Sequence, residues 1–184
     1  MPNHTFYQPL QSALTSGCNL RLPVILWGNG ACAPLGLQHQ NFLGEVASYG
    51  ALAIATGSVF VDPDVYDKPV RDSASGSPQN PEAISNAIDW VTANAGKGKW
   101  RHVDPTRIGV WGQSCGGLEA YTAGGQDSRV HHLGIFNSGQ FTKNATRSVV
   151  RGIHKPIFYF LGGLEDIAYA NVSVHSLSTC SSSD

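Results

Sequence analysis

The sequence predicts one α/β domain with a mainly parallel sheet, and three observations carry this prediction. Short apolar runs alternate along the chain with segments of helical spacing. The runs are apolar throughout, as in strands buried on both faces. The chain of 184 residues is long enough to bury one substantial core. We therefore expect an irregular N-terminal segment over residues 1–21, an α/β core over 22–170 and a disordered Ser-rich tail over 171–184.

The helices and strands of this core are predicted from apolar patterns and from the residues that begin or end such elements. Strands are predicted over residues 22–27, 51–55, 107–111, 133–136 and 156–161. Helices are predicted over 37–49, from Asn80-Pro81 to Gly96, over 118–123 and, more weakly, over 144–152. Asn80 offers a capping side chain and Pro81 suits the first helical position. The buried stripe of this helix is predicted at Ile84, Ile88, Val91 and Ala95. Residues 61–79 are polar and rich in Pro, Asp and Ser, so we expect a surface loop that helps to shape a cleft.

Composition excludes several classes of function. The net charge of −1 does not indicate a nucleic-acid surface, and no apolar run reaches membrane-spanning length. Phosphate-loop and dinucleotide signatures are missing, and histidines and cysteines lack the tight spacing of metal ligands, so we expect neither cofactor nor metal. Three N-x-[ST] sequons and four cysteines favour a secreted ancestry. The first residues resemble no signal peptide, so the compartment stays open.

The stretch R-I-G-V-W-G-Q-S-C-G-G, residues 107–117, contains a G-x-S-x-G pattern directly after a predicted strand. This pattern is typical of a nucleophile elbow, a strained turn between strand and helix that exposes a serine. A side chain at either flanking glycine would collide with the neighbouring strand or helix. We therefore predict Ser114 as a nucleophile at the carboxyl edge of the sheet, against the alternative of an ordinary glycine-rich turn.

A serine nucleophile needs an anion site for the tetrahedral oxyanion. One donor is expected to be the backbone N–H of Cys115, directly after the nucleophile, and the second that of Asn29 or Gly30. The plain alternative for this second loop is a structural turn. Cys32 and Cys115 both fall in these loops, where they either form a disulfide or are two small buried residues.

The acid and the base of such a site are expected after the nucleophile in the chain. Asp166 follows the last predicted strand and is the preferred acid, with Glu165 as the weaker alternative and a solvated loop acid as the plain one. Of the seven histidines, only His175 comes after Asp166, which makes it the candidate base. The alternative is a residue of a disordered tail, because the surrounding Ser-rich stretch has no helix or strand pattern. The pair at His131 and His132 precedes a strand, at the end away from the predicted site.

Three segments in this order resemble the α/β-hydrolase superfamily, namely L-P-V-I-L-W-G-N-G-A-C, G-Q-S-C-G-G and F-L-G-G-L-E-D-I-A-Y. The resemblance is to the dienelactone hydrolase and polyester-hydrolase-like type, and more closely to secreted fungal members, over residues 22–170. It implies Ser114 as nucleophile, Asp166 as acid, and backbone donors at Cys115 and near Asn29. Such proteins carry a histidine after one further helix and strand. That unit is missing after residue 170, so we expect a truncated chain whose strand over 157–161 forms an apolar sheet edge.

Two functions from different classes follow from these observations. The first is a serine hydrolase scaffold acting on a small carboxylic ester, impaired because no well-placed histidine follows Asp166. The second is a catalytically inactive fragment or a non-enzymatic binding protein. Neither the substrate nor the oligomeric state follows from the sequence.

Overall fold

The computed structural model describes residues 1, 3–15, 20–59, 79–140, 143–163 and 166. Within them, six strands form one mixed sheet in the order β1-β3-β2-β4-β5-β6. The strands are β1 (His4–Tyr7), β2 (Leu22–Gly28), β3 (Leu52–Thr56), β4 (Val103–Gln113), β5 (Val130–Phe136) and β6 (Ile157–Phe160). All neighbouring pairs are parallel except β1 with β3. The predicted α/β class with a mainly parallel sheet is therefore confirmed.

Helices flank the sheet on both faces. They are α1 (Gln11–Thr15), η1 (Gly30–Cys32), α2 (Gln40–Ser48), α4 (Pro81–Asn94), η3 (Gly98–Trp100), α5 (Cys115–Gly124) and α6 (Lys143–Val150). Each predicted helix and strand of the core has a counterpart at nearly the predicted position. The loop expected over residues 61–79 lies almost wholly outside the described residues, as does the tail 171–184.

The N-terminal segment corrects the sequence prediction. The sequence predicts an irregular segment over residues 1–21, yet these residues contain β1 and α1. β1 pairs antiparallel with β3, so that Thr5 lies opposite Ala55. The Thr5 hydroxyl, buried in this pairing, donates a hydrogen bond to the carbonyl of Gly57. A four-residue strand with one buried side chain gives no periodic signal, and its pairing partner decides its conformation.

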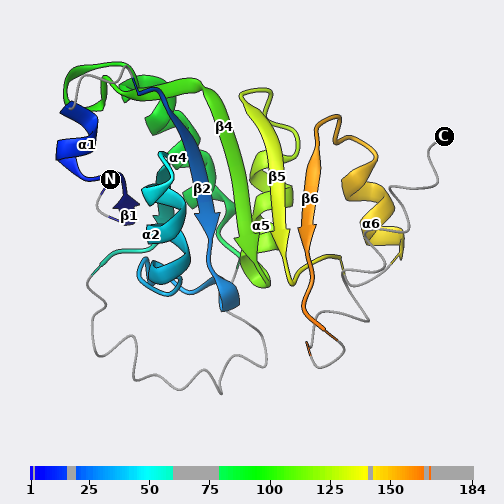
Figure 1. Cartoon of the computed structure of the whole chain (residues 1–184). Coiled ribbons are helices and arrows are strands. Elements are labelled where there is room, and N and C mark those ends of the chain that lie inside the picture. The colour runs from blue at the N-terminus through cyan, green and yellow to red at the C-terminus, as the bar shows by residue number, and fades with distance from the viewer. Residues whose placement is uncertain (2, 16–19, 60–78, 141–142, 164–165, 167–184) are drawn as a thin grey trace.

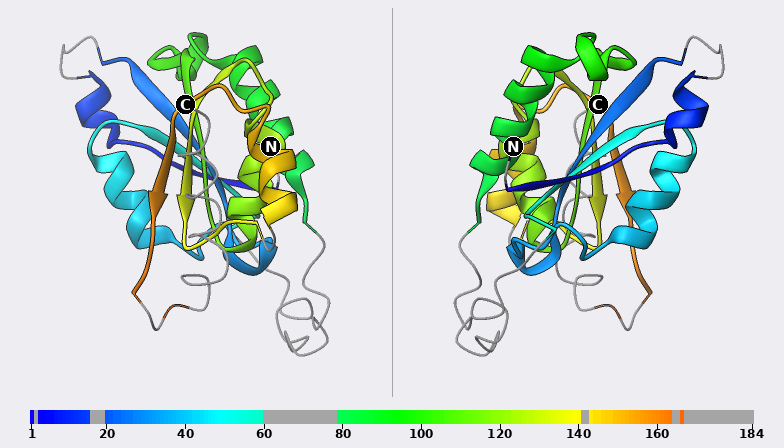
Figure 2. Two further views of the ribbon diagram at one scale, coloured as in Figure 1. Left: turned by 90° about the vertical axis from the view of Figure 1, so that its right-hand side faces the viewer. Right: turned by 90° about the vertical axis from the view of Figure 1, so that its left-hand side faces the viewer.

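The connections of the parallel strands explain which helix covers which face. From β2 the chain moves to β3 on one side, whereas from β3 it returns across the sheet to β4 and continues to β5 and β6. Connections between parallel strands are right-handed. A helix that leads to a strand on one side of the sheet therefore lies on the opposite face from a helix that leads to a strand on the other side. Figure 2 shows this arrangement, with α2 on one face and α4, α5 and α6 on the other.

The larger part of the core lies between the sheet and the face of α4 and α5. The predicted buried stripe of α4 is confirmed, because Ile84, Ile88 and Val91 are fully buried there. The Asn80 side chain caps this helix by accepting a hydrogen bond from the Ala83 N–H. A smaller cluster on the α2 face contains Trp27 and Leu43.

The strand β6 stands at the edge of the described sheet, as the sequence predicts. Its side chains alternate: Ile157 and Tyr159 pack against the main core, whereas Phe158 and Phe160 are 52% and 50% exposed. Phe160 stacks face to face on Phe136 of β5, with ring centroids 4.3 Å apart. This edge therefore presents an exposed aromatic surface.

Candidate functional site

The carboxyl ends of β2, β4, β5 and β6 meet at one edge of the sheet (Figure 1). Since the chain leaves β2 in one direction and β4 in the other, the switch point of the topology lies between these two neighbouring strands. Ligands of open α/β sheets bind at such a point. The loops after β2 and β4, which carry the predicted oxyanion donors and the predicted nucleophile, meet there.

The backbone of Ser114 is strained. Ser114 stands between β4 and α5 with φ 52° and ψ −118°, a conformation that side-chain-bearing residues rarely adopt. Its N–H donates to the Phe136 carbonyl, and its own carbonyl accepts from the Gly117 N–H. These bonds on both sides of the turn hold Ser114 in the conformation that the elbow pattern predicts.

Close backbone packing explains the two flanking glycines. A Cβ on Gly112 would lie 2.1 Å from the Gly116 carbonyl oxygen, and a Cβ on Gly116 would lie 2.1 Å from that of Gly28. Both distances are far below van der Waals contact. The expected role of these glycines is confirmed, because only residues without Cβ allow β2, β4 and α5 to approach this closely.

The loop after β2 places the predicted second oxyanion donor beside the elbow. The Asn29 nitrogen would be 2.7 Å from a Cβ on Gly116, so this amide lies directly against the start of α5. Gly30 lies beneath the Gln113 side chain, whose Oε1 would be 2.1 Å from a Cβ there. Cys115 is the first residue of α5, so its N–H has no acceptor inside the helix. The predicted donors therefore lie on two adjoining loops.

The Asn29 side chain has a structural role that the sequence did not reveal. It is fully buried, and its Nδ2 lies within hydrogen-bond distance of the carbonyls of Ala33, Leu35 and Thr56. Its Oδ1 is buried and has no hydrogen-bond partner. These contacts tie the loop after β2 to the end of β3.

A disulfide joins Cys32 to Cys115, with Cα atoms 5.2 Å apart. This finding decides between the two alternatives that the sequence left open for these residues. The other two cysteines, Cys18 and Cys180, lie outside the described residues.

The loop after β5 connects the elbow to the loop after β6, and its part in the site was not predicted from the sequence. Ser138 is buried, and its hydroxyl donates a 2.5 Å hydrogen bond to the Ser114 carbonyl. Asn137 has φ 43°, its N–H donates to the Phe160 carbonyl, and its Oδ1 accepts from the Gly162 N–H. The only sequence signal is N-S-G directly after a buried strand, in the same position as the other site loops.

Asp166, the predicted acid, lies in the loop after β6 at the same edge of the sheet. Its N–H donates to the Gly163 carbonyl, and its carboxylate lies over Gly162, where a Cβ would be 2.7 Å from Oδ2. Since β5 separates β4 from β6, the ends of these strands are about 10 Å apart. Asp166 therefore does not lie directly beside Ser114. Glu165 and His175 fall outside the described residues.

Within the described residues, no histidine is hydrogen bonded to Ser114. His131 and His132 lie at the amino end of β5, as predicted. His39 lies beside the carboxyl end of β2, but its Nδ1 accepts a hydrogen bond from the Trp27 indole N–H. Neutral His39 therefore carries its proton on Nε2, and burial lowers the pKa of this imidazole. His39 is thus arranged as a neutral hydrogen-bond donor.

Glu119 is a buried carboxyl group on the elbow helix, behind the loop after β2. It is 2% exposed, and its Oε1 accepts a 2.7 Å hydrogen bond from the Asn80 N–H. Burial raises the pKa of Glu119, and the bond from Asn80 opposes this shift in part. Glu119, Cys32 and Thr56 line a cavity of about 270 Å³ at the carboxyl edge.

No protein-family model matches this sequence, and no curated protein is significantly similar to it. In the described part of the chain, no group of three or more His, Cys, Asp or Glu residues could hold a metal ion. Nor does that part contain a helix both long and apolar enough to cross a membrane. The interpretation of the site therefore depends on its geometry.

Proposed function

We propose that the protein is a serine hydrolase of the α/β-hydrolase type that acts on small carboxylic esters. The observation that carries this proposal is the left-handed backbone of Ser114, held between glycines at the switch point of a parallel sheet. Strain of this kind persists only where the surrounding structure enforces it, and it gathers at functional sites.

The proposed reaction proceeds through an acyl-enzyme. The Ser114 hydroxyl oxygen attacks the ester carbonyl carbon while a base takes its proton, and the alcohol leaves with that proton. The backbone N–H groups of Cys115 and of Asn29 or Gly30 would stabilise the negative oxygen of the intermediate. Water then attacks the acyl-enzyme and releases the acid. No cofactor takes part.

We assign the role of the base to His175, with Asp166 fixing its tautomer. The imidazole would have to occupy the gap between the ends of β4 and β6. The described histidines offer no substitute beside Ser114, so we expect weak activity. A non-catalytic protein that retains the elbow is the second candidate. It is favoured because no described histidine is hydrogen bonded to Ser114.

Replacement of Ser114 tests the proposed nucleophile. We expect Ser114→Ala to lower kcat/KM for p-nitrophenyl butyrate by about 10³-fold or more, because the acyl-enzyme can no longer form. A fluorophosphonate probe should add one phosphonyl group to Ser114, detected by peptide mass.

Two controls make this experiment decisive. Ser128→Ala changes an exposed serine at the opposite edge of the sheet and should leave kcat/KM unchanged. His175→Ala should lower it if this histidine is the base. Hydrolysis that survives in Ser114→Ala, together with no probe on Ser114, would exclude the hydrolase and leave the non-catalytic alternative.

A further inference from the structure

The disulfide Cys32–Cys115 connects the two loops that carry the proposed oxyanion donors. Cys32 is the last residue of η1, after β2, and Cys115 is the first residue of α5, directly after Ser114. The two cysteines are 83 residues apart in the chain. They meet because β2 and β4 are neighbours whose carboxyl ends align at Gly28 and Gly112.

The backbone is strained on both sides of this bond. Ala31 and Cys32 have φ values of 55° and 51°, and Ser114 has 52°. Three non-glycine residues with positive φ therefore lie at the disulfide or directly beside it. Such residues return to ordinary conformations unless other contacts prevent this.

The described hydrogen bonds of the loop after β2 join it to β3 and to itself, and not to the elbow. Asn29 ties the loop to β3 through its Nδ2, and the Cys32 and Ala33 N–H groups bond within the loop itself. Among the described residues, no hydrogen bond joins 30–32 to the elbow over 113–117. Gly28 and Asn29 pack against Gly116, and the Gln113 side chain lies over Gly30. Beside these packing contacts, the disulfide is the covalent bond that limits the distance between the two loops.

We propose that this disulfide is a positioning device for the oxyanion site, so that breaking it slows the acylation of Ser114 without unfolding the protein. This inference rests on the proposed hydrolase function. Oxyanion donors act only within about 2.7–3.1 Å of the developing negative oxygen. A loop released from α5 would relax its strained residues, and the amides of Asn29 and Gly30 would then move relative to that of Cys115.

A purely structural disulfide would behave differently. A bond that closes a long loop stabilises a protein mainly by restricting the unfolded chain. Its loss would lower Tm but leave the reaction rate of the folded protein unchanged. A positioning disulfide lowers the rate of the chemical step in protein that is still folded.

The experiment compares the oxidised and reduced forms of a Cys18→Ser/Cys180→Ser background, in which only Cys32 and Cys115 can pair. A fluorophosphonate is added at several concentrations, and the maximal rate of Ser114 phosphonylation is separated from the concentration that gives half of it. Labelling is measured well below the Tm of each form, with far-UV circular dichroism as the control for folding. Cys32→Ala/Cys115→Ala in the same background removes the bond without leaving a free thiol beside Ser114.

We expect the maximal rate to fall at least tenfold in the reduced form and in the alanine variant, with the half-saturating concentration unchanged within about twofold. Reoxidation with glutathione disulfide should restore the rate. Equal maximal rates in the folded oxidised and reduced forms would overturn the positioning role and leave the hydrolase proposal intact. A reduced form that is unfolded at every temperature would also overturn it, because the bond would then serve the fold itself. Absence of labelling in the oxidised form would overturn both proposals.

Discussion

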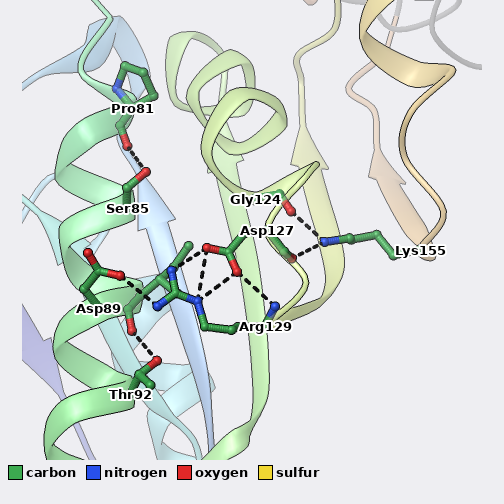
Figure 3. Close-up of polar contacts among 9 residues, drawn as sticks. Pro81, Ser85, Asp89, Thr92, Gly124, Asp127, Arg129 and Lys155 are labelled. Carbon is green, nitrogen blue, oxygen red and sulfur yellow. Dashed lines mark hydrogen bonds and ion pairs between the residues drawn. The ribbon is translucent and has the colours of Figure 1, made fainter.

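The two edges of the sheet are built on opposite principles. At the carboxyl edge lie all four non-glycine residues of the described chain with positive φ, namely Ala31, Cys32, Ser114 and Asn137. The amino edge carries a cluster of ion pairs and hydrogen bonds, shown in Figure 3, where the Arg129 guanidinium lies between Asp127 and Asp89. The Lys155 ammonium group donates there to the carbonyls of Gly124 and Asp127. One edge stores strain and the other supplies stability, which is the division expected when a rigid scaffold supports a functional site.

One carboxyl group at each edge shows the same contrast in its pKa: Asp127 at the amino edge and Glu119 at the carboxyl edge. Hydrogen bonds from Arg129 hold the pKa of Asp127 below its usual range, so this group is stabilised as a charge. Burial raises the pKa of Glu119 at the carboxyl edge, so its charged form is destabilised. Four changes test this contrast, beginning with the largest expected effect.

Loss of the disulfide should have the largest effect on stability. The chain-entropy model gives about 4.5 kcal/mol for a bond that closes a loop of 83 residues. We expect Cys32→Ala/Cys115→Ala to lower the free energy of unfolding by roughly this amount in urea titrations. A loss below about 1 kcal/mol would show that the strained loop largely offsets the gain.

Removal of the Asp127 charge should weaken the amino edge. Asp127→Asn is expected to lower the free energy of unfolding by about 1–2 kcal/mol at pH 7, since charged hydrogen bonds from Arg129 are lost. Because the folded pKa of Asp127 lies below its unfolded value, this contribution is present above the ordinary pKa. It is lost as the pH falls through the folded value. Urea titrations of both proteins should therefore converge as the pH falls below about 4.

Asp89 supplies the matched control for this prediction. It pairs with the same guanidinium from α4, but its side chain is 65% exposed. Asp89→Asn should therefore change stability by less than about 1 kcal/mol. Equal effects of the two substitutions would contradict the role given to the partly buried Asp127.

Glu119 should show the opposite dependence on pH. Its folded pKa is raised, so the native state binds its proton more tightly and wild-type stability falls as the pH rises above the ordinary value. Glu119→Gln has no charge to bury and retains an acceptor for the Asn80 N–H. In thermal melts, the Tm of Glu119→Gln relative to that of the wild type should increase as the pH is raised from 4 to 8. A constant difference between the two proteins would contradict the raised pKa.

Relief of backbone strain at Ser114 should have a small, stabilising effect. Ser114→Gly is expected to raise the free energy of unfolding by about 1 kcal/mol, because relief of a strained φ exceeds the greater freedom of glycine in the unfolded chain. Ser128→Gly at the amino edge, where φ is not positive, should lower stability instead. Urea titration of both variants measures this difference. If Ser114→Gly is also destabilising, the elbow does not store strain.

Much of the sheet could be predicted because its strands have a local apolar pattern. The apolar runs that became β2, β3 and β5 are buried on both faces, so nearly every residue in them carries the signal. The helix α4 could be predicted from its cap and its buried stripe. The strand β1 could not, since its conformation depends on pairing with β3, about fifty residues later in the sequence.

The same distinction holds for the candidate site. The elbow pattern predicted the turn at Ser114 because glycines at 112 and 116 are needed wherever backbones meet so closely. The links made by Ser138 and Asn137 could not be predicted. They depend on which loops adjoin, and a serine and an asparagine after a strand have many other uses.

The sequence by itself determined the α/β class, the order of the core elements and the position of the strained serine, because each is written in local pattern and sterics. Only the tertiary structure decided that Cys32 bonds to Cys115 and that the Asn29 side chain ties its loop to β3. It also decided that Asp166 lies two strands from Ser114. These facts depend on which strands are neighbours. Strand order is set by the packing of the whole sheet, and no short stretch of sequence contains it.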